Sequence, residues 1–322
     1  MFVFVKLSEL QKLTQKLSQL PESAGENQQL ALMQQLGLEF GNFYQELEMD
    51  SPYVDTHQDI STSNATVQFH SHAFYELLCC RNSCGAEYLM GSERYKLQKG
   101  DVVFVPPNVS HRPILPDQMS EPYKRDVLWI SEEFLNNASR VFPELSVDFF
   151  SKPRLMRTAG TKWESLCGLF RKGVLEAEAA EMGWEILVTA NTLTILTHLR
   201  RCMNDPHAKP LSAEKPDLLD QVLAYVEQHL SEKISLADVA RYFFVSESTI
   251  IQTFRKKMGV SFYRCVTQRR LISAKVLIEQ GLSMDSVAER VGFSDYSSFF
   301  RAFKQEYGIS PRQFRKLQVE QK

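Results

Sequence analysis

Hydrophobic residues recur with two different spacings along the 322-residue chain. Leucine and other apolar residues return every three or four positions in 8–20 and 27–48, which predicts helices. Between about 53 and 130, polar and apolar residues alternate in short runs separated by Gly or Pro, which predicts strands of a sandwich or small barrel. The helical spacing returns in 161–178 and 181–203.

A stretch with three prolines and few apolar residues, 204–216, is typical of an interdomain linker. Everything after it has helical spacing. We therefore expect an α+β protein with a helical extension (1–52), a β-barrel followed by a helical hairpin (53–203), the linker, and an all-helical domain (217–322).

The last region contains the same small unit twice. Each copy has Val-Ala, then Ser six residues after the Ala, then an aromatic residue followed by four residues, Gly, any residue and Ser. The two sets are Val239, Ala240, Ser246, Phe254, Gly259 and Ser261, and Val287, Ala288, Ser294, Phe303, Gly308 and Ser310. A short apolar helix, a tight turn, a Ser N-cap and a second amphipathic helix predict a helix-turn-helix, here in tandem.

The second helix of each unit has a polar outer face. The outward residues are Glu247, Ser248, Thr249, Gln252 and Arg255 in the first copy, and Asp295, Tyr296, Ser297, Ser298, Arg301 and Lys304 in the second. Such faces can hydrogen-bond base edges and phosphates in the major groove of double-stranded DNA. A predicted helix over 262–280, roughly 28 Å long at 1.5 Å per residue, is close to the ~34 Å between successive major grooves. A single copy would equally fit an ordinary solvated helix face, but the duplication favours DNA.

The net charge of −2 hides an asymmetry between the two halves of the chain. The region 217–322 has 16 basic and 12 acidic residues, whereas 1–216 has 21 basic and 27 acidic. This distribution fits a phosphate-binding surface confined to one domain.

Compartment and redox state are constrained by what the chain contains. No apolar run approaches the roughly 20 residues that span a bilayer. The apolar stretch near the first residue is too short for the hydrophobic region of a signal peptide. We expect a cytoplasmic protein without membrane contact. The six cysteines then correspond to small buried hydrophobes in a reducing compartment, and Cys79, Cys80 and Cys84 lack the second cysteine pair of a zinc site.

The stretches SVAERVGFSDYSSFFRAFK (286–304) and GISPRQFR (308–315) resemble the DNA-binding domain of the AraC/XylS family of bacterial transcription regulators, and the resemblance covers about 220–316. It implies promoter DNA and RNA polymerase as partners, with activation as the commoner role. The chain departs from the family at Gln252, where Arg is frequent, and at Ile251 and Phe300, where a small polar residue is frequent.

A second cluster lies in the strand-rich region. His70, His72 and Glu76 have equal parity, so on one strand they would share a face. With Gly100, Pro106 and a closing His111, they resemble the two cupin motifs, although Asn108 stands where Gly is usual. In metal-binding cupins the matching residues, His70, His72, Glu76 and His111, would hold a divalent Zn, Fe, Mn or Ni ion.

The preferred expectation for this barrel is an effector pocket without a cofactor, and a divalent metal is the alternative. The pocket would use His70, His72, Glu76, Tyr88, Phe104 and His111. Tyr75 and Trp129 are further candidates for stacking on a ring, and sugars are the ligand class that the resemblance implies.

We therefore expect a ligand-responsive, sequence-specific transcription regulator, an activator linked to carbohydrate metabolism, and not an enzyme. The alternatives are a constitutive DNA-binding regulator with a vestigial barrel and a metal-dependent cupin enzyme fused to a DNA-binding domain. A homodimer is expected through apolar stripes on the helical hairpin, which could otherwise bury within their own domain. The stripe residues are Leu166, Leu169, Phe170, Leu187, Leu193 and Leu196.

Overall fold

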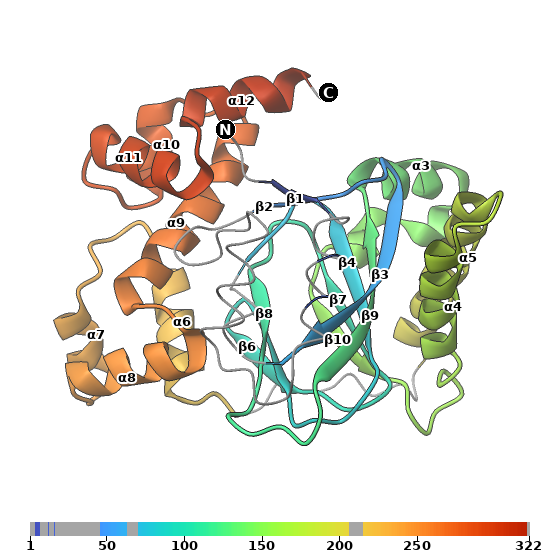
Figure 1. Ribbon diagram of the computed structural model, residues 1–322. Helices are drawn as coiled ribbons and strands as arrows, with labels where there is room; N and C mark the ends of the chain where they lie inside the picture. The colour runs from blue at the N-terminus through green and yellow to red at the C-terminus, as the bar shows by residue number, and fades with distance from the viewer. Residues whose placement is uncertain are drawn as a thin grey trace.

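The computed structural model describes residues 4–6, 12, 16, 46–62, 70–205 and 215–320 and has the expected α+β architecture. A domain of β-strands lies in the middle of the molecule, a pair of helices covers one side of it, and an all-helical C-terminal domain lies on the opposite side (Figure 1).

Two antiparallel sheets build the central domain, here called the β-domain together with its covering helices. The larger sheet has the strand order β10-β7-β4-β9-β3 and the smaller one β6-β5-β8. The strands are β3 (Val54–Ser61), β4 (Tyr75–Cys80), β5 (Glu87–Met90), β6 (Glu93–Lys96), β7 (Asp101–Val105), β8 (His111–Ile114), β9 (Tyr123–Ile130) and β10 (Arg154–Arg157). The strand prediction for 53–130 is confirmed, whereas β10 was not predicted.

Successive side chains on the strands of the larger sheet point alternately into the interior between the two sheets and to the outer face, which helices cover. On β7, Val103 and Val105 join the interior cluster, whereas Val102 and Phe104 join the cluster beneath the helices. The central strands β4, β7 and β9 are therefore buried on both faces along nearly their whole length.

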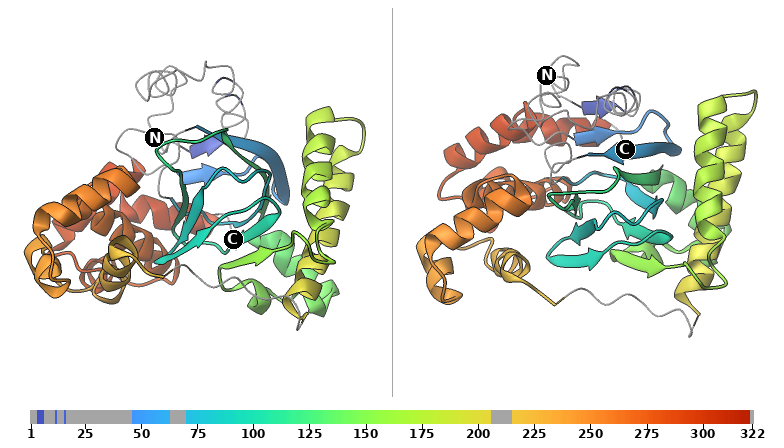
Figure 2. Two further views of the ribbon diagram at one scale, coloured as in Figure 1. Left: turned by 90° about the horizontal axis from the view of Figure 1, so that it is seen from below. Right: turned by 60° about the horizontal axis from the view of Figure 1, so that its bottom comes forward.

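The predicted helical hairpin is present as α4 (Leu166–Ala179) and α5 (Trp184–Met203), which cover the outer face of the larger sheet (Figure 2). Leu166, Phe170 and Leu196 are buried there. These stripe residues therefore belong to the core of their own domain. The connection from β9 to β10 contains α3 (Glu132–Val141) and the short helices η2 (Pro143–Leu145) and η3 (Val147–Phe150).

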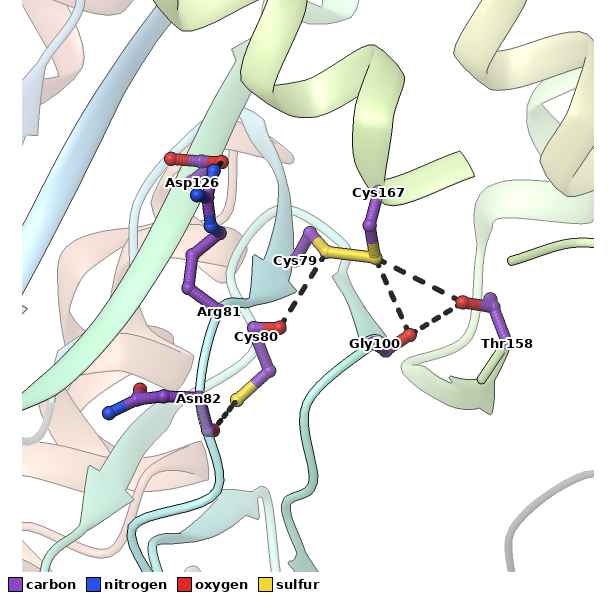
Figure 3. Close-up of a disulfide and its surroundings, with 8 residues drawn as sticks. All are labelled: Cys79, Cys80, Arg81, Asn82, Gly100, Asp126, Thr158 and Cys167. Carbon is purple, nitrogen blue, oxygen red and sulfur yellow. Dashed lines mark hydrogen bonds and ion pairs between the residues drawn. A yellow bond between two sulfur atoms is a disulfide. The ribbon is translucent and has the colours of Figure 1, made fainter. Parts of the chain in front are cut away.

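Cys79 on β4 and Cys167 on α4 form a disulfide, with Cα atoms 5.7 Å apart (Figure 3). The expectation that all cysteines are unpaired is wrong for these two, because the fold brings together residues 88 positions apart in sequence. The other four cysteines are free and buried, as expected: Cys80, Cys84, Cys202 and Cys265.

The C-terminal domain consists of helices only. They are α6 (Leu218–Gln228), α7 (Leu236–Tyr242), α8 (Glu247–Met258), α9 (Phe262–Glu279), α10 (Met284–Arg290), α11 (Tyr296–Tyr307) and α12 (Pro311–Glu320). The pairs α7–α8 and α10–α11 are the two predicted helix-turn-helix units. Each has its own hydrophobic core, and α9 contributes residues to both cores.

Most of the predicted helical extension and of the linker lies outside the described residues. Where the extension is described, Glu46–Glu48 forms strand β2, which pairs in parallel with β1 (Phe4–Lys6). The expectation of a helix through residue 48 is therefore wrong at its end. Among the described helices, none combines the length and apolarity needed to cross a membrane.

Candidate functional site

The two second helices of the repeats, α8 and α11, begin at different kinds of cap. Ser246 caps α8 by accepting a hydrogen bond from Thr249 N at 3.1 Å. The predicted cap Ser294 is wrong for α11, because the N-cap is Asp295, which accepts from Ser298 N at 2.7 Å. Ser294 Oγ donates to the Asp295 carboxylate instead. These hydrogen bonds lower the pKa of Asp295, and the one from Ser298 N has the largest effect. The carboxylate therefore caps the helix and is not free to contact a DNA base.

The outer faces of α8 and α11 are open. The predicted contact residues that are exposed are Glu247, Ser248, Thr249, Gln252, Arg255, Asp295, Ser297, Arg301 and Lys304, and the half-buried ones are Tyr296 and Ser298. The opposite sides of the two helices are anchored by Ile250 and Phe254 and by Phe299 and Phe303, all buried. Packing therefore fixes the orientation of both faces.

The helix α9 sets the distance between the two faces. Its 18 residues give a length of about 27 Å. Gly259 and Gly308, with φ of 69° and 72°, end α8 and α11 in the left-handed conformation, as expected from the repeated Gly-x-Ser. The length of α9 is close to the ~34 Å between successive major grooves of B-DNA.

In the β-domain, the structure brings His70, His72, Glu76 and His111 together, here called the histidine cluster. The ring centroid of His111 lies 4.4 Å from that of His70 and 4.9 Å from that of His72. The prediction that His70, His72 and Glu76 share a face of one strand is wrong. His70 forms an isolated bridge with His111, and His72 lies in the connection before β4. Only Glu76 is part of a strand on that side of the cluster.

Backbone carbonyls orient two of the imidazoles. Nδ1 of His72 lies 2.8 Å from Phe74 O, and Nδ1 of His111 lies 2.8 Å from Val109 O. A carbonyl oxygen only accepts, so Nδ1 carries the proton and Nε2 points into the cluster. Burial lowers the pKa of His72, which favours its neutral form.

These residues fit a divalent metal. One ligand atom from each of His70, His72 and His111 lies within 4.8 Å of the other two. Three atoms so spaced have a common point about 2.8 Å away, and small side-chain shifts would reach the 2.0–2.2 Å of metal–nitrogen bonds. Metal-binding histidines are commonly oriented by a hydrogen bond from their other ring nitrogen, and the Nδ1 bonds to Phe74 O and Val109 O are of this kind.

Glu76 lies at the inner wall of the cluster and has several partners. Its Oε2 is 3.1 Å from His111 Nε2 and accepts from Tyr88 OH at 3.2 Å, and its Oε1 accepts from Trp129 Nε1 at 3.0 Å. Although burial raises the pKa of Glu76, its contacts with His111 and His72 hold it well below the ordinary value.

The interior contains a second polar group that the sequence analysis missed. Arg125 is buried and donates to Asp59 at 2.6 Å, and the ring of His57 lies 4.8 Å from that of Trp129. Nε2 of His57 lies 3.5 Å from Oδ1 of Asp59, and Tyr123 is buried on the same face. Alternation on β3 and β9 places these residues on one face, so parity could have found them.

Two predicted pocket residues are elsewhere. Phe104 and Tyr75 face the covering helices, and the Phe104 ring packs against Phe150 at 5.4 Å. The prediction of Phe104 as a pocket residue is therefore wrong, because its parity on β7 is that of the outer face. Tyr88 and Trp129 do line the interior.

Comparison with known proteins adds to this geometry. Residues 239–317 match a helix-turn-helix domain family. A probable transcriptional regulator, LumQ of Photobacterium leiognathi, is 38% identical over 31% of this chain and 42% of its own length. The HTH-type transcriptional activator RhaS of Salmonella arizonae is 26% identical over 76% of this chain and 86% of its own length. The crystal structure of ToxT from Vibrio cholerae is similar over 84% of this chain and 99% of that chain, at 14% identity and a TM-score of 0.33.

Proposed function

We propose that this chain, whose C-terminal domain is an AraC-type helix-turn-helix domain, is a cytoplasmic transcription regulator whose DNA binding responds to a small molecule held in the β-domain. The observation that carries the proposal is the pair of exposed polar faces on α8 and α11, joined by the one helix α9. The relatives named above are transcription regulators, so we assign the interior of the β-domain a binding role and not a catalytic one.

Selection of bound sequences from random double-stranded DNA tests the first half of this proposal. We expect the full chain to enrich a site with two conserved segments about one helical turn apart, one for each of α8 and α11. Enrichment of a single segment would remove one helix from the interface. A chain that enriches nothing would contradict the proposal.

We further propose that the effector is a small polar molecule of the sugar class. Support comes from the polar side chains inside the β-domain: His57 beside the ring of Trp129, and the ion pair of Asp59 with Arg125. Hydroxyl groups can both donate to and accept from such side chains. A thermal-shift screen of monosaccharides and polyols against the full chain would identify the effector.

His72→Ala then tests where the effector binds. We expect it to abolish the effector response while leaving effector-free DNA binding nearly intact, because His72 is held by Phe74 O and the contact with His111 on β8 is made by Glu76. Tyr75→Phe, on the helix-covered face, is the matched control. A response that survives in His72→Ala would place the effector elsewhere, and no response in the parent chain would favour the constitutive alternative.

A divalent metal is the second candidate for the bound group, because the three imidazole nitrogens converge. His70, His72 and His111 would hold it with Glu76 beside them, and it would supply a positive charge that orients oxygen atoms of an effector. Elemental analysis of the purified chain and Co²⁺ titration followed by visible absorption test this candidate. Equal Co²⁺ binding by the parent and by His70→Ala would exclude it.

A homodimer is proposed through the outward side of α4 and α5 and the turn between them. The apolar residues exposed there are Leu175, Met182, Ile186 and Leu187. Exposed apolar side chains grouped on one face are typical of association surfaces. Sedimentation should show a dimer for the parent chain and for the control Glu181→Gln, and a monomer for Ile186→Glu.

We also propose that the DNA-bound chain activates transcription by contacting RNA polymerase. Transcription in vitro with purified polymerase, on a template that carries the selected site upstream of a promoter, tests this. Unchanged or reduced transcript would contradict activation.

A further inference from the structure

Strand β8 faces two sites at once. His111, its first residue, is fully buried and belongs to the histidine cluster, where it contacts Glu76. The next residue, Arg112, is 1% exposed and points to the opposite side, toward the C-terminal domain. Two neighbours on the same outer face, Leu89 and Ile114, belong to the hydrophobic core that contains α6–α9. The outer face of β5 and β8 is therefore part of the interface with the first helix-turn-helix unit.

Arg112 contacts the end of α8. Its Nη1 donates to Met258 O at 2.7 Å, and its Nε donates to Pro113 O at 3.0 Å. Met258 is the last residue of α8, before the left-handed Gly259. The C-terminal carbonyls of a helix carry partial negative charge, so a guanidinium there is favourable. Burial lowers the pKa of Arg112 to about 10, which shows how far this charge is removed from water.

A second contact from the same edge reaches α9. Gly91 follows β5 directly, and its carbonyl accepts from Arg269 Nη2 at 2.8 Å. The amide of Gly91 donates to Ser110 O at 2.8 Å, immediately before His111. The end of the β5–β8 pair therefore holds both the end of α8 and the middle of α9, the helix that spaces α8 and α11.

We propose that Arg112 is a positioning residue for DNA binding, which links the state of the histidine cluster to the orientation of α8. This inference rests on the proposed function. His111 and Arg112 are consecutive, so a displacement of His111 toward a bound group moves the Arg112 backbone with it. The hydrogen bond to Met258 O passes that displacement to α8. An effector then changes operator affinity because it binds one arrangement of β8 and α8 better than the other.

A double-mutant cycle on the full chain tests this link without knowledge of the effector. Glu76→Gln changes the side chain that contacts His111 from another strand, and Arg112→Met removes the donor to Met258 O while keeping side-chain length. Affinity is measured on DNA selected by the parent chain. We expect Glu76→Gln to change the affinity about threefold or more when Arg112 is present and less than about 1.5-fold in the Arg112→Met background.

Two further variants separate a link from general damage. Arg112→Lys keeps a donor and should retain the effect of Glu76→Gln. Lys256→Met removes a different contact between the domains, the exposed ion pair with Asp117 at 3.2 Å, and its effect should add to that of Glu76→Gln. Circular dichroism confirms that each variant is folded.

Additive effects of Glu76→Gln and Arg112→Met would overturn the inference, as would a Glu76→Gln variant with parental affinity in both backgrounds. Either result leaves the proposed function intact, since the chain still binds DNA. A parent chain that binds no DNA would instead refute the proposed function.

Discussion

Gly292 and Phe244 occupy the same position in the two helix-turn-helix units, four residues after the Ala of each Val-Ala pair. Both adopt positive φ, 86° and 56° respectively. The first unit tolerates a bulky residue because the Phe244 side chain is 96% exposed. In the second unit, a Cβ on Gly292 would lie 2.1 Å from Leu230 O. Only glycine satisfies both the conformation and the space there.

Gly292→Ala should therefore destabilise the chain by about 2–4 kcal/mol, because left-handed strain and a clash with backbone add. Urea unfolding measures the change. Gly259→Ala is the matched control, since it has φ of 69° but open space around its Cβ, and it should cost about 1–2 kcal/mol of strain alone. Equal losses in the two variants would contradict the clash.

Arg301 is exposed on the outer face of α11, and its Nη2 lies 3.4 Å from Ser298 Oγ. Its guanidinium is free to donate in pairs to guanine or to a phosphate. Arg301→Ala should weaken binding to the selected DNA by about 1–3 kcal/mol, measured by gel shift. Arg140→Ala, on the exposed surface of α3, is the control. Parental affinity in a folded Arg301→Ala variant would remove this residue from the interface.

At the level of residues, sequence motifs located the histidine cluster, but parity along a strand explained it wrongly. His70 and His72 converge with His111 through a β-bridge and an irregular connection, and neither feature has a period in the sequence. The interior residues His57 and Arg125 do obey parity. In the sequence, polar residues at these positions of β3 and β9 indicate strands with one face in solvent. The burial of Arg125 could not be deduced because it depends on the ion pair with Asp59, which lies on another strand.

Among the elements, the α7–α8 and α10–α11 units were predicted almost completely. The same residue spacing occurs in both units, so each copy supports the assignment of the other. The cap of α11 differs by one residue because both Ser294 and Asp295 are good caps, and the extended backbone at Asp295 decides between them. The contact of Cys79 with Cys167 depends on how α4 lies across the larger sheet, which no local pattern contains.

The Cys79–Cys167 disulfide ties α4 to β4 and closes a loop of 88 residues. In the chain-entropy description a loop of this length contributes up to about 4–5 kcal/mol to the free energy of unfolding. Dithiothreitol should therefore lower the urea midpoint of the parent chain.

Cys167→Ser provides the control for that measurement. Its urea midpoint should not respond to dithiothreitol, and it should lie near that of the reduced parent chain. A parent chain whose midpoint is the same with and without the reductant would contradict a stabilising disulfide.

At the scale of the whole molecule, the excess of basic residues lies in the region 217–322, with 16 basic against 12 acidic residues. We expect residues 217–322 to bind the selected DNA alone, more weakly than the full chain. With about six phosphate contacts, affinity should fall by about 1,000-fold or more between 50 and 200 mM salt, because counterions are released on binding. Gel shifts at several salt concentrations measure this. A folded fragment that shifts no DNA would show that the β-domain is needed for binding.

The helix pair α4–α5 and the C-terminal domain lie on opposite sides of the β-domain (Figure 2). Two copies joined back to back through α4 and α5 would therefore carry their DNA-binding domains at the two far ends of the assembly. Under the proposed function, each end would cover two consecutive grooves by itself. Such a dimer would not read one compact palindrome; it would hold two separate sites at once, and the DNA between them would have to curve around the protein. Occupancy of the regulatory region would then depend on the distance between the sites and on their helical phase as well as on their sequences.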